Sequence, residues 1–241
     1  MKHHLNETSS TNAWMSAKLR ELRTNGEAIP DLWAVFADYQ TAGRGAGTNI
    51  WHSSPGLNIL TSICFDTGLA AADQFVFNLW FATATRKFLA KYVPDVRIKW
   101  PNDMYVHDRK LAGDLTEHAL SGNRLDYTVA GIGINVNEEI FPDWIPNPTS
   151  LKTVTGGEYI PEDELVPLLE RIFEEYDNLS DDTARRYMDL LYLKGIRHQY
   201  TDTSTGRQFW GTITSVVKDG RLEIKTADGY YRYFAFKEVA Y

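Results

Sequence analysis

Apolar residues along the first 194 positions follow helical spacing in some segments and strand spacing in others. Helical spacing is found at 14–22, 73–92, 161–176 and 181–193. Apolar or alternating strand-like runs are found at 32–39, 57–65, 96–100, 104–106, 111–117 and 125–136. These periods predict helices packed on a β-sheet, with residues 107–110 forming the turn of a hairpin.

The start of the first helix is marked by Ser9-Ser10-Thr11-Asn12, whose hydroxyl and amide groups cap free backbone N–H groups. Pro161 opens a later helix and is followed directly by three acidic residues, which suit the helix dipole. The histidines His3 and His4 fall in a terminus that we expect to be frayed.

After Gly195 the pattern changes to short alternating strands without a helix. These strands are predicted at 209–213, 222–225 and 230–236, and two Asp-Gly turns separate them. Such a unit predicts a small β-barrel that is too short to hold a strong core alone, so it should dock on the main domain. We therefore predict two domains, 1–194 and 195–241.

Charge and cysteine content restrict the function further. The 241 residues include 25 basic and 32 acidic side chains, a net charge of −7 that argues against a general nucleic-acid binder. The single cysteine, Cys64, cannot form an internal disulfide. Neither a signal peptide nor a membrane span is visible. These features predict a soluble cytoplasmic protein that acts at no membrane.

A glycine-rich loop, Gly43-Arg44-Gly45-Ala46-Gly47, follows the strand at 32–39. Closely spaced glycines let backbone N–H groups approach phosphate oxygens, and an arginine can contact the same oxygens with two donors. The loop lacks the Gly-Lys-Ser/Thr of a P-loop and the glycine spacing of a dinucleotide site. A flexible surface loop is the alternative interpretation.

Three further segments carry candidate polar groups at strand ends or turns. In Lys99-Trp100-Pro101-Asn102-Asp103 an amide and a carboxylate follow a strand, although an ordinary Asn-Asp turn has the same pattern. Lys110 falls in the predicted hairpin turn, where a lysine is usually solvated, and Gly113 follows it. Gly131 and Gly133 interrupt the next strand before Asn135, which indicates close approach of a ligand, a pair of bulges or close packing of the strand.

Together and in this order, these segments resemble the biotin protein ligases. The matching residues are Ser10-Thr11-Asn12, Tyr39 to Gly45, Trp51, Lys99 to Asp103, Arg109 to Gly113, Glu117 and Gly131 to Asn135. The resemblance implies an α+β fold, a mixed sheet with packed helices related to class II aminoacyl-tRNA synthetases, followed by an SH3-like barrel. It also implies that no N-terminal DNA-binding domain is present here, and therefore no DNA binding.

The resemblance implies a two-step reaction. Biotin and ATP, with Mg²⁺, give biotinyl-5′-AMP, and a lysine of a biotin carboxyl carrier protein then attacks it. Lys110, Arg44 and Asp103 are the implied catalytic residues. The implied biotin-binding residues are Ser10, Thr11, Asn12, Gln40, Gly43, Arg44, Gly45, Ala46, Lys110, Gly113, Leu115, Gly131 and Gly133. The implied nucleotide-binding residues are Arg44, Gly45, Trp51, Asn102, Lys110 and Asn135, with Asn135 also a candidate on the Mg²⁺ side.

The chain departs from the family pattern in two segments. Ala46 and Gly47 stand where many members have arginines, and Asp114 stands where many have an apolar residue. We expect Asp114 to pair with a cation or to face solvent or a subunit interface. The alternative functions are a lipoate or octanoate ligase and a non-catalytic biotin-binding module, and a homodimer is left open.

Overall fold

The first helix begins where the sequence predicts it. Ser10 is the N-cap of α1 (Thr11–Thr24), and its side chain accepts a hydrogen bond from the Ala13 backbone N–H. Met15 and Leu19 are fully buried on the face of α1 that packs on the sheet. The structure, a computed structural model, describes residues 2–176 and 182–241.

The main sheet has seven strands in the order β1-β2-β3-β7-β6-β5-β4. Its strands are β1 (Lys2–Thr8), β2 (Trp33–Gln40), β3 (Ile59–Phe65), β4 (Arg97–Lys99), β5 (Asp103–Val106), β6 (Arg109–Ser121) and β7 (Arg124–Ile134). β1 and β2 are parallel, whereas every other neighbouring pair is antiparallel. The predicted mixed sheet with packed helices is therefore confirmed.

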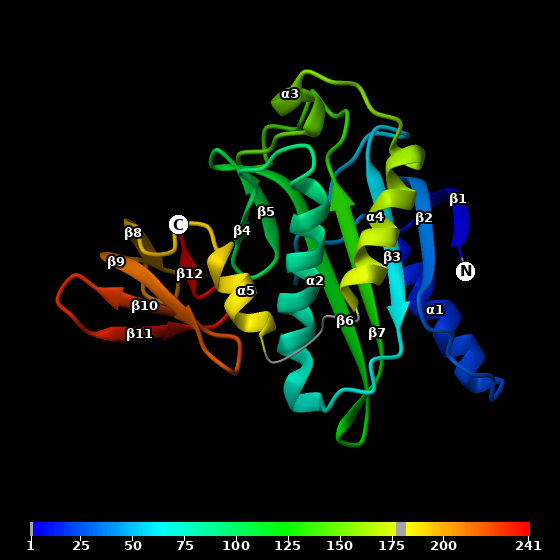
Figure 1. Cartoon of the computed structure of the whole chain (residues 1–241), viewed down its shortest axis with the longest axis horizontal. Helices are drawn as coiled ribbons and strands as arrows, with labels where there is room; N and C mark the ends of the chain where they lie inside the picture. Colours follow the sequence, from blue (N-terminus) through cyan, green and yellow to red (C-terminus); the bar gives the residue numbers. More distant parts are fainter. Residues whose placement is uncertain (1, 177–181) are drawn as a thin grey trace.

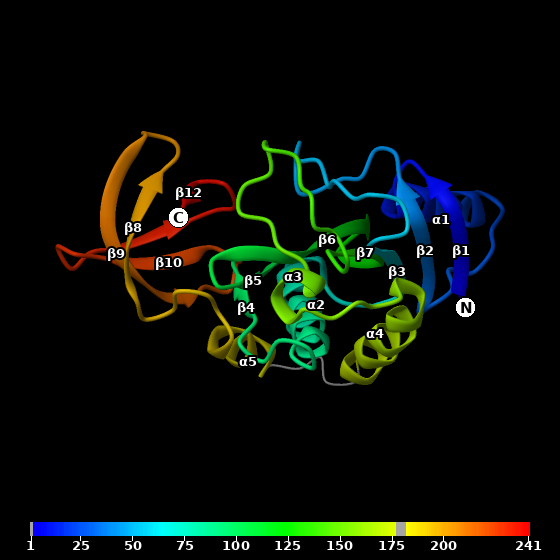
Figure 2. The same ribbon diagram turned by 90° about the horizontal axis from the view of Figure 1, so that it is seen from above.

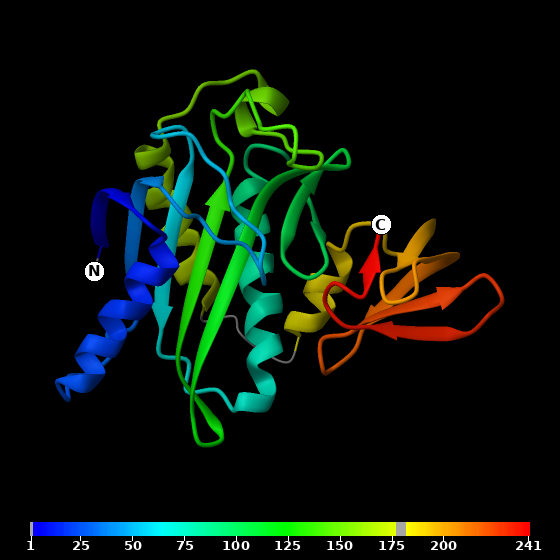
Figure 3. The same cartoon turned by 180° about the vertical axis from the view of Figure 1, so that it is seen from behind.

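Helices cover both faces of this sheet. Helices α2 (Gln74–Leu89), α4 (Pro161–Tyr176) and α5 (Thr183–Asp189) lie on one face, and α1 lies on the other, as Figures 1 and 2 show. A short 3₁₀ helix, η1 (Ala71–Asp73), precedes α2, and α3 (Leu151–Thr155) follows the sheet. The loop after β2 crosses the α1 face in front of β6 and β7, a part of this face that α1 does not cover (Figure 3).

The C-terminal strands form a separate antiparallel sheet in the order β11-β10-β9-β8-β12. Its strands are β8 (Arg197–Asp202), β9 (Arg207–Val216), β10 (Leu222–Thr226), β11 (Tyr231–Phe234) and β12 (Val239–Ala240). The buried cores of the two sheets belong to one hydrophobic cluster. A second, antiparallel unit is thus present. Its SH3-like closure and the boundary at residue 195 stay predictions.

Several local expectations were wrong. Residues 2–8 are not frayed, because β1 pairs with β2, His4 stacks on Phe36 and the His4 ring bonds Asp38. The strands β8 and β12 and the helix α3 were not predicted. The helix expected at 181–193 is shorter, since α5 spans Thr183–Asp189, and residue 181 lies outside the described residues.

Two corrections concern the candidate site. The β5–β6 turn consists of His107 and Asp108, both with positive φ, so Lys110 lies in strand β6 and not in the turn. Gly131 and Gly133 do not break β7, because both pair with β3 and β6 in regular register. Among the described residues, none of the helices is long and apolar enough to cross a membrane.

Candidate active site

A cavity of about 730 Å³ lies on the α1 face of the main sheet and extends to the second sheet. Sixteen of the predicted site residues line it: Ser10, Thr11, Asn12, Gln40, Arg44, Gly45, Ala46, Trp51, Asn102, Asp103, Lys110, Gly113, Leu115, Gly131, Gly133 and Asn135. Gly43 does not line it. This glycine is buried beneath the loop, where an added Cβ would come 2.4 Å from the Trp51 carbonyl oxygen.

Lys110 and Asp103 form an ion pair inside this cavity. The distance from Lys110 Nζ to Asp103 Oδ1 is 2.7 Å, and both side chains are about 70% buried, with exposed fractions of 28% and 30%. Lys110 Nζ also lies 5.5 Å from the centre of the Trp51 ring. The absence of a side chain at Gly113 makes room for the pair, because an added Cβ would lie 3.1 Å from Asp103 Oδ1 and 3.3 Å from Lys110 Nζ.

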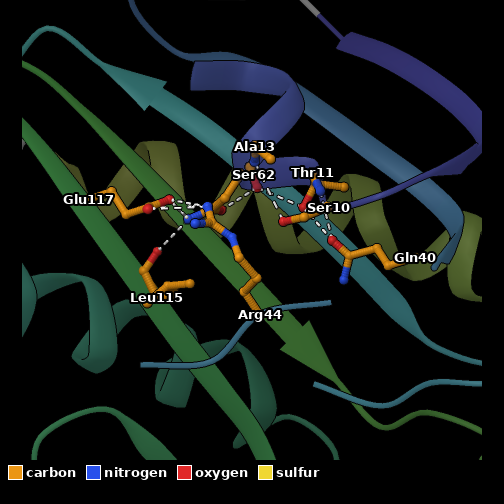
Figure 4. Close-up of polar contacts among 9 residues, drawn as sticks. Ser10, Thr11, Ala13, Gln40, Arg44, Ser62, Leu115 and Glu117 are labelled. Atoms are coloured by element: carbon orange, nitrogen blue, oxygen red, sulfur yellow. Dashed lines mark hydrogen bonds and ion pairs between the residues drawn. The ribbon is translucent and has the colours of Figure 1, made fainter. Parts of the chain in front are cut away.

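At the other end of the cavity, polar side chains from α1, β2 and β3 are joined by hydrogen bonds (Figure 4). The Thr11 backbone N–H donates to Gln40 Oε1 at 2.7 Å, and the Thr11 hydroxyl donates to the same oxygen at 3.1 Å. Because Gln40 Oε1 already accepts twice, Gln40 offers its Nε2 hydrogens to a ligand. Ser62 Oγ lies 2.7 Å from Thr11 Oγ1 and donates to Asn12 Oδ1 at 2.5 Å.

The same region is closed by an ion pair between the glycine loop and strand β6. Arg44 Nη2 donates to both carboxylate oxygens of Glu117, at 2.9 and 3.1 Å. Asn12 Nδ2 donates to Glu117 Oε2 at 2.8 Å and to the Leu115 carbonyl at 3.2 Å. Arg44 therefore crosses the open side of this polar cluster, as Figure 4 shows.

The two glycines of β7 are required by side chains of the protein. A Cβ at Gly131 would lie 2.2 Å from Asn12 Oδ1, and one at Gly133 would lie 2.5 Å from Trp51 Cε2. The proposed bulges are absent, and the close approach is that of Asn12 and Trp51. These glycines shape the cavity by allowing the two side chains to pack directly on the strand.

Asp114 contradicts the expectation for its environment. It is 6% exposed, faces α2, and has Thr85 Oγ1 as a donor at 3.2 Å to its Oδ1, whereas its Oδ2 has no partner. Burial raises the pKa of the Asp114 carboxyl well above its usual value, and the Thr85 hydrogen bond opposes this only in part. Burial thus favours the neutral form of Asp114, which neither pairs with a cation nor faces solvent.

The backbone of Asp114 supports the turn that carries Asn102 and Asp103. The Asp114 N–H donates to the Asn102 carbonyl at 3.0 Å, and Asn102 Nδ2 donates to the Asp114 carbonyl at 2.5 Å. The amide nitrogen of Asn102 is thus used within the protein. This double contact fixes the turn at the edge of the cavity beside Lys110.

Several cavity residues from distant parts of the chain had no predicted role: Lys99 was named only as part of the segment 99–103, and Tyr105, Tyr241 and Lys237 were not named. Lys99 Nζ lies 4.8 Å from the ring centres of both Tyr105 and Tyr241 and donates to the Tyr241 carbonyl at 3.0 Å. Burial lowers the pKa of Lys99. Lys237, from the second sheet, would lie 2.8 Å from a Cβ placed on Gly47. No local signal in the sequence connects these residues with the loop.

One residue could contribute an oxygen to a metal. Asn135 is buried at the cavity wall, and its Nδ2 donates to the Thr149 carbonyl at 2.9 Å. Its Oδ1 is the oxygen type that Mg²⁺ accepts. The described residues contain no group of three or more His, Cys, Asp or Glu side chains that could hold a metal ion.

Comparison with solved structures identifies the fold. The fold is that of the biotin protein ligase from Aquifex aeolicus solved with biotin and ATP, with a TM-score of 0.74 at 23% identity, covering 99% of this chain and 97% of that one. The Leishmania major biotin protein ligase, solved with biotinyl-5-AMP, matches with a TM-score of 0.64 at 22% identity, covering 97% and 98%.

Sequence comparison defines the family. A model of the biotin/lipoate A/B protein ligase family matches residues 6–135, more than half of the 241 residues, and the chain belongs to this family. The bifunctional ligase/repressor BirA of Bacillus spizizenii is 28% identical over 225 residues, which cover 87% of this chain and 66% of that protein. The Escherichia coli BirA is 35% identical over 129 residues, covering 53% and 37%. The chain thus spans less than two thirds of the length of these relatives.

Proposed function

We propose that this protein activates biotin with ATP and transfers it to a lysine of a biotin carboxyl carrier protein. In the first step a biotin carboxylate oxygen attacks the α-phosphorus of ATP, a mixed anhydride forms, and pyrophosphate leaves. In the second step the ε-amine of the acceptor lysine attacks the biotinyl carbonyl, an amide forms, and AMP and a proton leave. The relatives named above are the first support for this proposal.

The observation that carries the proposal is the position of Lys110. This lysine is partly buried in the cavity, with Asp103 as its ion-pair partner and the wall of polar side chains from α1 and β2 in the same space. Joining a carboxylate to a phosphate brings like charges together. A cation fixed between them stabilises the charge that grows in the transition state.

The remaining site residues have proposed roles in the same cavity. Thr11, Gln40 and Ser10 bind the ureido ring of biotin, and Leu115 lines the slot for its aliphatic chain. Arg44 and the glycine loop cover the adenylate and exclude water, which would hydrolyse the anhydride. Asp103 orients the acceptor lysine or accepts its proton. The ordinary pKa of that lysine is about 10.4.

Magnesium is part of the proposal as an ion that would arrive with ATP and would supply positive charge to its phosphates. Asn135 Oδ1 is the protein oxygen that would contact this ion. A cytoplasmic location is part of the proposal and rests on the sequence features given above. A homodimer and the absence of DNA binding stay predictions that sedimentation and a DNA mobility-shift assay can test.

Biotin-dependent exchange of labelled pyrophosphate into ATP tests the first step, with lipoate and octanoate as competing substrates. We expect exchange when biotin is the substrate and no exchange with lipoate or octanoate. Exchange supported only by lipoate or octanoate would establish the alternative ligase. Biotin binding without any exchange would instead establish a non-catalytic biotin-binding module.

Transfer is tested separately with a purified carrier domain. We expect one biotin per acceptor lysine, detected by mass spectrometry, and none when that lysine is replaced by alanine.

A further inference from the structure

Glu117 stands at the meeting point of the glycine loop, helix α1 and strand β6. Its carboxylate accepts from Arg44 of the loop and from Asn12 of the helix, and its own side chain is 37% exposed. We propose that Glu117 is a positioning residue for the biotin slot, which orients the Asn12 amide and holds Arg44 across the slot. This inference rests on the proposed function.

The first step of the argument concerns the two hydrogens of the Asn12 amide. A carboxylate and a backbone carbonyl can only accept, so Glu117 Oε2 and the Leu115 carbonyl both require Nδ2 on their side of Asn12. Both amide hydrogens are consumed by these two partners. Asn12 therefore has no donor left for a ligand, and it acts on biotin through its neighbours.

The second step concerns the oxygen of the same amide. With Nδ2 held by Glu117, the Asn12 Oδ1 faces Ser62 and directs the single Ser62 hydroxyl hydrogen toward itself at 2.5 Å. The oxygen also packs on Gly131, where an added Cβ would come within 2.2 Å. The amide orientation that Glu117 imposes on Asn12 thus sets the direction of the Ser62 hydroxyl. The oxygen of this hydroxyl lies 2.7 Å from Thr11 Oγ1.

The third step concerns charge. Glu117 places a negative charge beside a cavity that must receive the biotin carboxylate and the ATP phosphates. Arg44 neutralises this charge with a contact to both carboxylate oxygens. Such a half-exposed pair is weak in free energy, but it selects one position for a long side chain in a glycine-rich loop. Glu117 thereby links the loop to the slot (Figure 4).

The test replaces Glu117 by Gln, which keeps the size of the side chain and turns one acceptor oxygen into a donor. In either orientation of the new amide its NH2 group faces Arg44 Nη2, and in one orientation it also faces Asn12 Nδ2; both of these groups are donors themselves. We expect the biotin Kd, measured by calorimetry, to rise about tenfold (roughly 1.4 kcal/mol) while the ATP Kd changes less than about threefold. Loss of both affinities together with a large fall in melting temperature would overturn the positioning role.

A double-mutant cycle separates action through Asn12 from direct contact with biotin. If Glu117 acts through Asn12, Glu117→Gln should weaken biotin binding much less in an Asn12→Ala background than in the wild type. Equal effects in both backgrounds would assign Glu117 to the ligand itself. A tighter biotin Kd in Glu117→Gln would also contradict the proposal, because it would make the Arg44–Glu117 pair an obstacle.

A second measurement needs no ligand and no activity. Trypsin cleaves after arginine, and we expect cleavage after Arg44 to be faster in Glu117→Gln, by up to about fivefold, the factor that an exposed ion pair supports. The matched control is Asp126→Asn, which removes the partner of Arg23 between α1 and β7, outside the cavity lining. This control should change neither cleavage after Arg44 nor the biotin Kd.

The biotin-binding and trypsin-cleavage measurements together distinguish the possible failures. If the wild type does not bind biotin, the proposed function fails, and the cleavage rate alone decides whether Glu117 holds the loop. If the wild type binds biotin and Glu117→Gln binds it equally well, the positioning role is wrong while the proposed function stands.

Discussion

At the scale of single residues, the cavity places groups of opposite charge in contact before any substrate is present. Lys110 pairs with Asp103 at 2.7 Å, and Gly113 makes the space that the two side chains occupy. The strand position of Lys110 gives its side chain a fixed direction, which a solvated turn would not provide. This geometry supports a role for Lys110 in binding the developing charge and not merely in surface solvation.

We expect Lys110→Ala to reduce biotin-dependent pyrophosphate exchange by a factor of at least about 100, with little change in melting temperature. The reason is that loss of one charge-assisted contact to a developing charge costs on the order of 3 kcal/mol. Arg109→Ala is the matched control, since Arg109 is the exposed cation next to it on β6. Near wild-type exchange in Lys110→Ala would show that another cation performs this role.

A second prediction at this scale concerns Asp114. Burial raises the pKa of this carboxyl in the folded protein, so the folded state binds a proton that the unfolded state releases above about pH 4. The contribution of Asp114 to the free energy of unfolding is therefore greatest below pH 4 and falls as the pH rises toward the raised pKa. We expect Asp114→Asn and Asp114→Val to raise the melting temperature at pH 7.

The gain should shrink as the pH is lowered and should be smallest near pH 4, where Asp114 is protonated in the folded state and about half protonated in the unfolded state. Melting temperatures between pH 4 and pH 8 measure this difference. A gain that does not depend on pH would assign the effect to packing. A marked loss of stability would mean that the Asp114–Thr85 contact is a specific structural requirement.

At the scale of elements, the loop after β2 is tied down at its base and open at its tip. The Trp51 N–H donates to the Gly43 carbonyl at 3.0 Å, and Ser54 donates through its N–H and its hydroxyl to the buried Glu138, both at 2.8 Å. Between these anchors, Ala46 has no side-chain donor and Gly47 has φ of +67°. Within the tip the Gly45 N–H donates to the Asn49 carbonyl at 2.8 Å, so the backbone is paired while position 46 has no side-chain donor to offer a ligand.

We expect the wild-type protein to release biotinyl-adenylate and expect Ala46→Arg to slow this release about ten- to a hundredfold. The physical reason is an added hydrogen bond from a cation to the phosphate, worth about 1.5–3 kcal/mol and expressed mainly in the dissociation rate. Dissociation of preformed adenylate, followed by tryptophan fluorescence, measures it. The pyrophosphate exchange rate should change little.

Lys237→Ala is the companion variant, because Lys237 Nζ lies beside Gly47. Equal release from wild type and Ala46→Arg, combined with faster release from Lys237→Ala, would show that the second sheet already supplies the missing contact. Equal release from all three proteins would leave Thr48, Asn49 or Trp51 as the group that retains the ligand.

At the scale of the whole molecule, the second sheet is part of the cavity and of the core. Tyr200, Ile213 and Leu222 belong to the same buried cluster as the main sheet and α2. Trp100 Nε1 donates to the Gly220 carbonyl at 3.1 Å, and an added Cβ on Gly220 would lie 2.6 Å from the Phe75 ring. The two proposed domains share one apolar interior.

We expect the full chain to unfold in one cooperative transition and residues 195–241 alone to lack one. A fragment of this length buries too little apolar surface to offset its chain entropy, and its inner face would be exposed to water. Calorimetry of both proteins tests this. A separate cooperative melt of the fragment would contradict it and establish an independent domain.

Local pattern explains why the main elements were predictable. Ser10 caps α1 through its own side chain, and the apolar residues of α4 at Leu165, Leu168, Leu169 and Ile172 are buried at the predicted spacing. In contrast, β1 and β8 are largely polar, since β1 is mostly exposed on both faces and β8 is exposed on one. Both strands are held by backbone pairing with a neighbouring strand, which requires no apolar side chains. Their sequences therefore show no hydrophobic period.

The sequence by itself determined the positions of α1, α2 and α4, the glycine loop and sixteen of the residues that line the cavity, because these depend on local capping, spacing and chain order. Only the tertiary structure decided that Gly131 accommodates Asn12, that Asp114 is buried against Thr85, and that Glu117 receives Arg44 and Asn12. These contacts join residues far apart in the chain. Their partners are selected by the packing of side chains across the sheet, which local spacing does not encode.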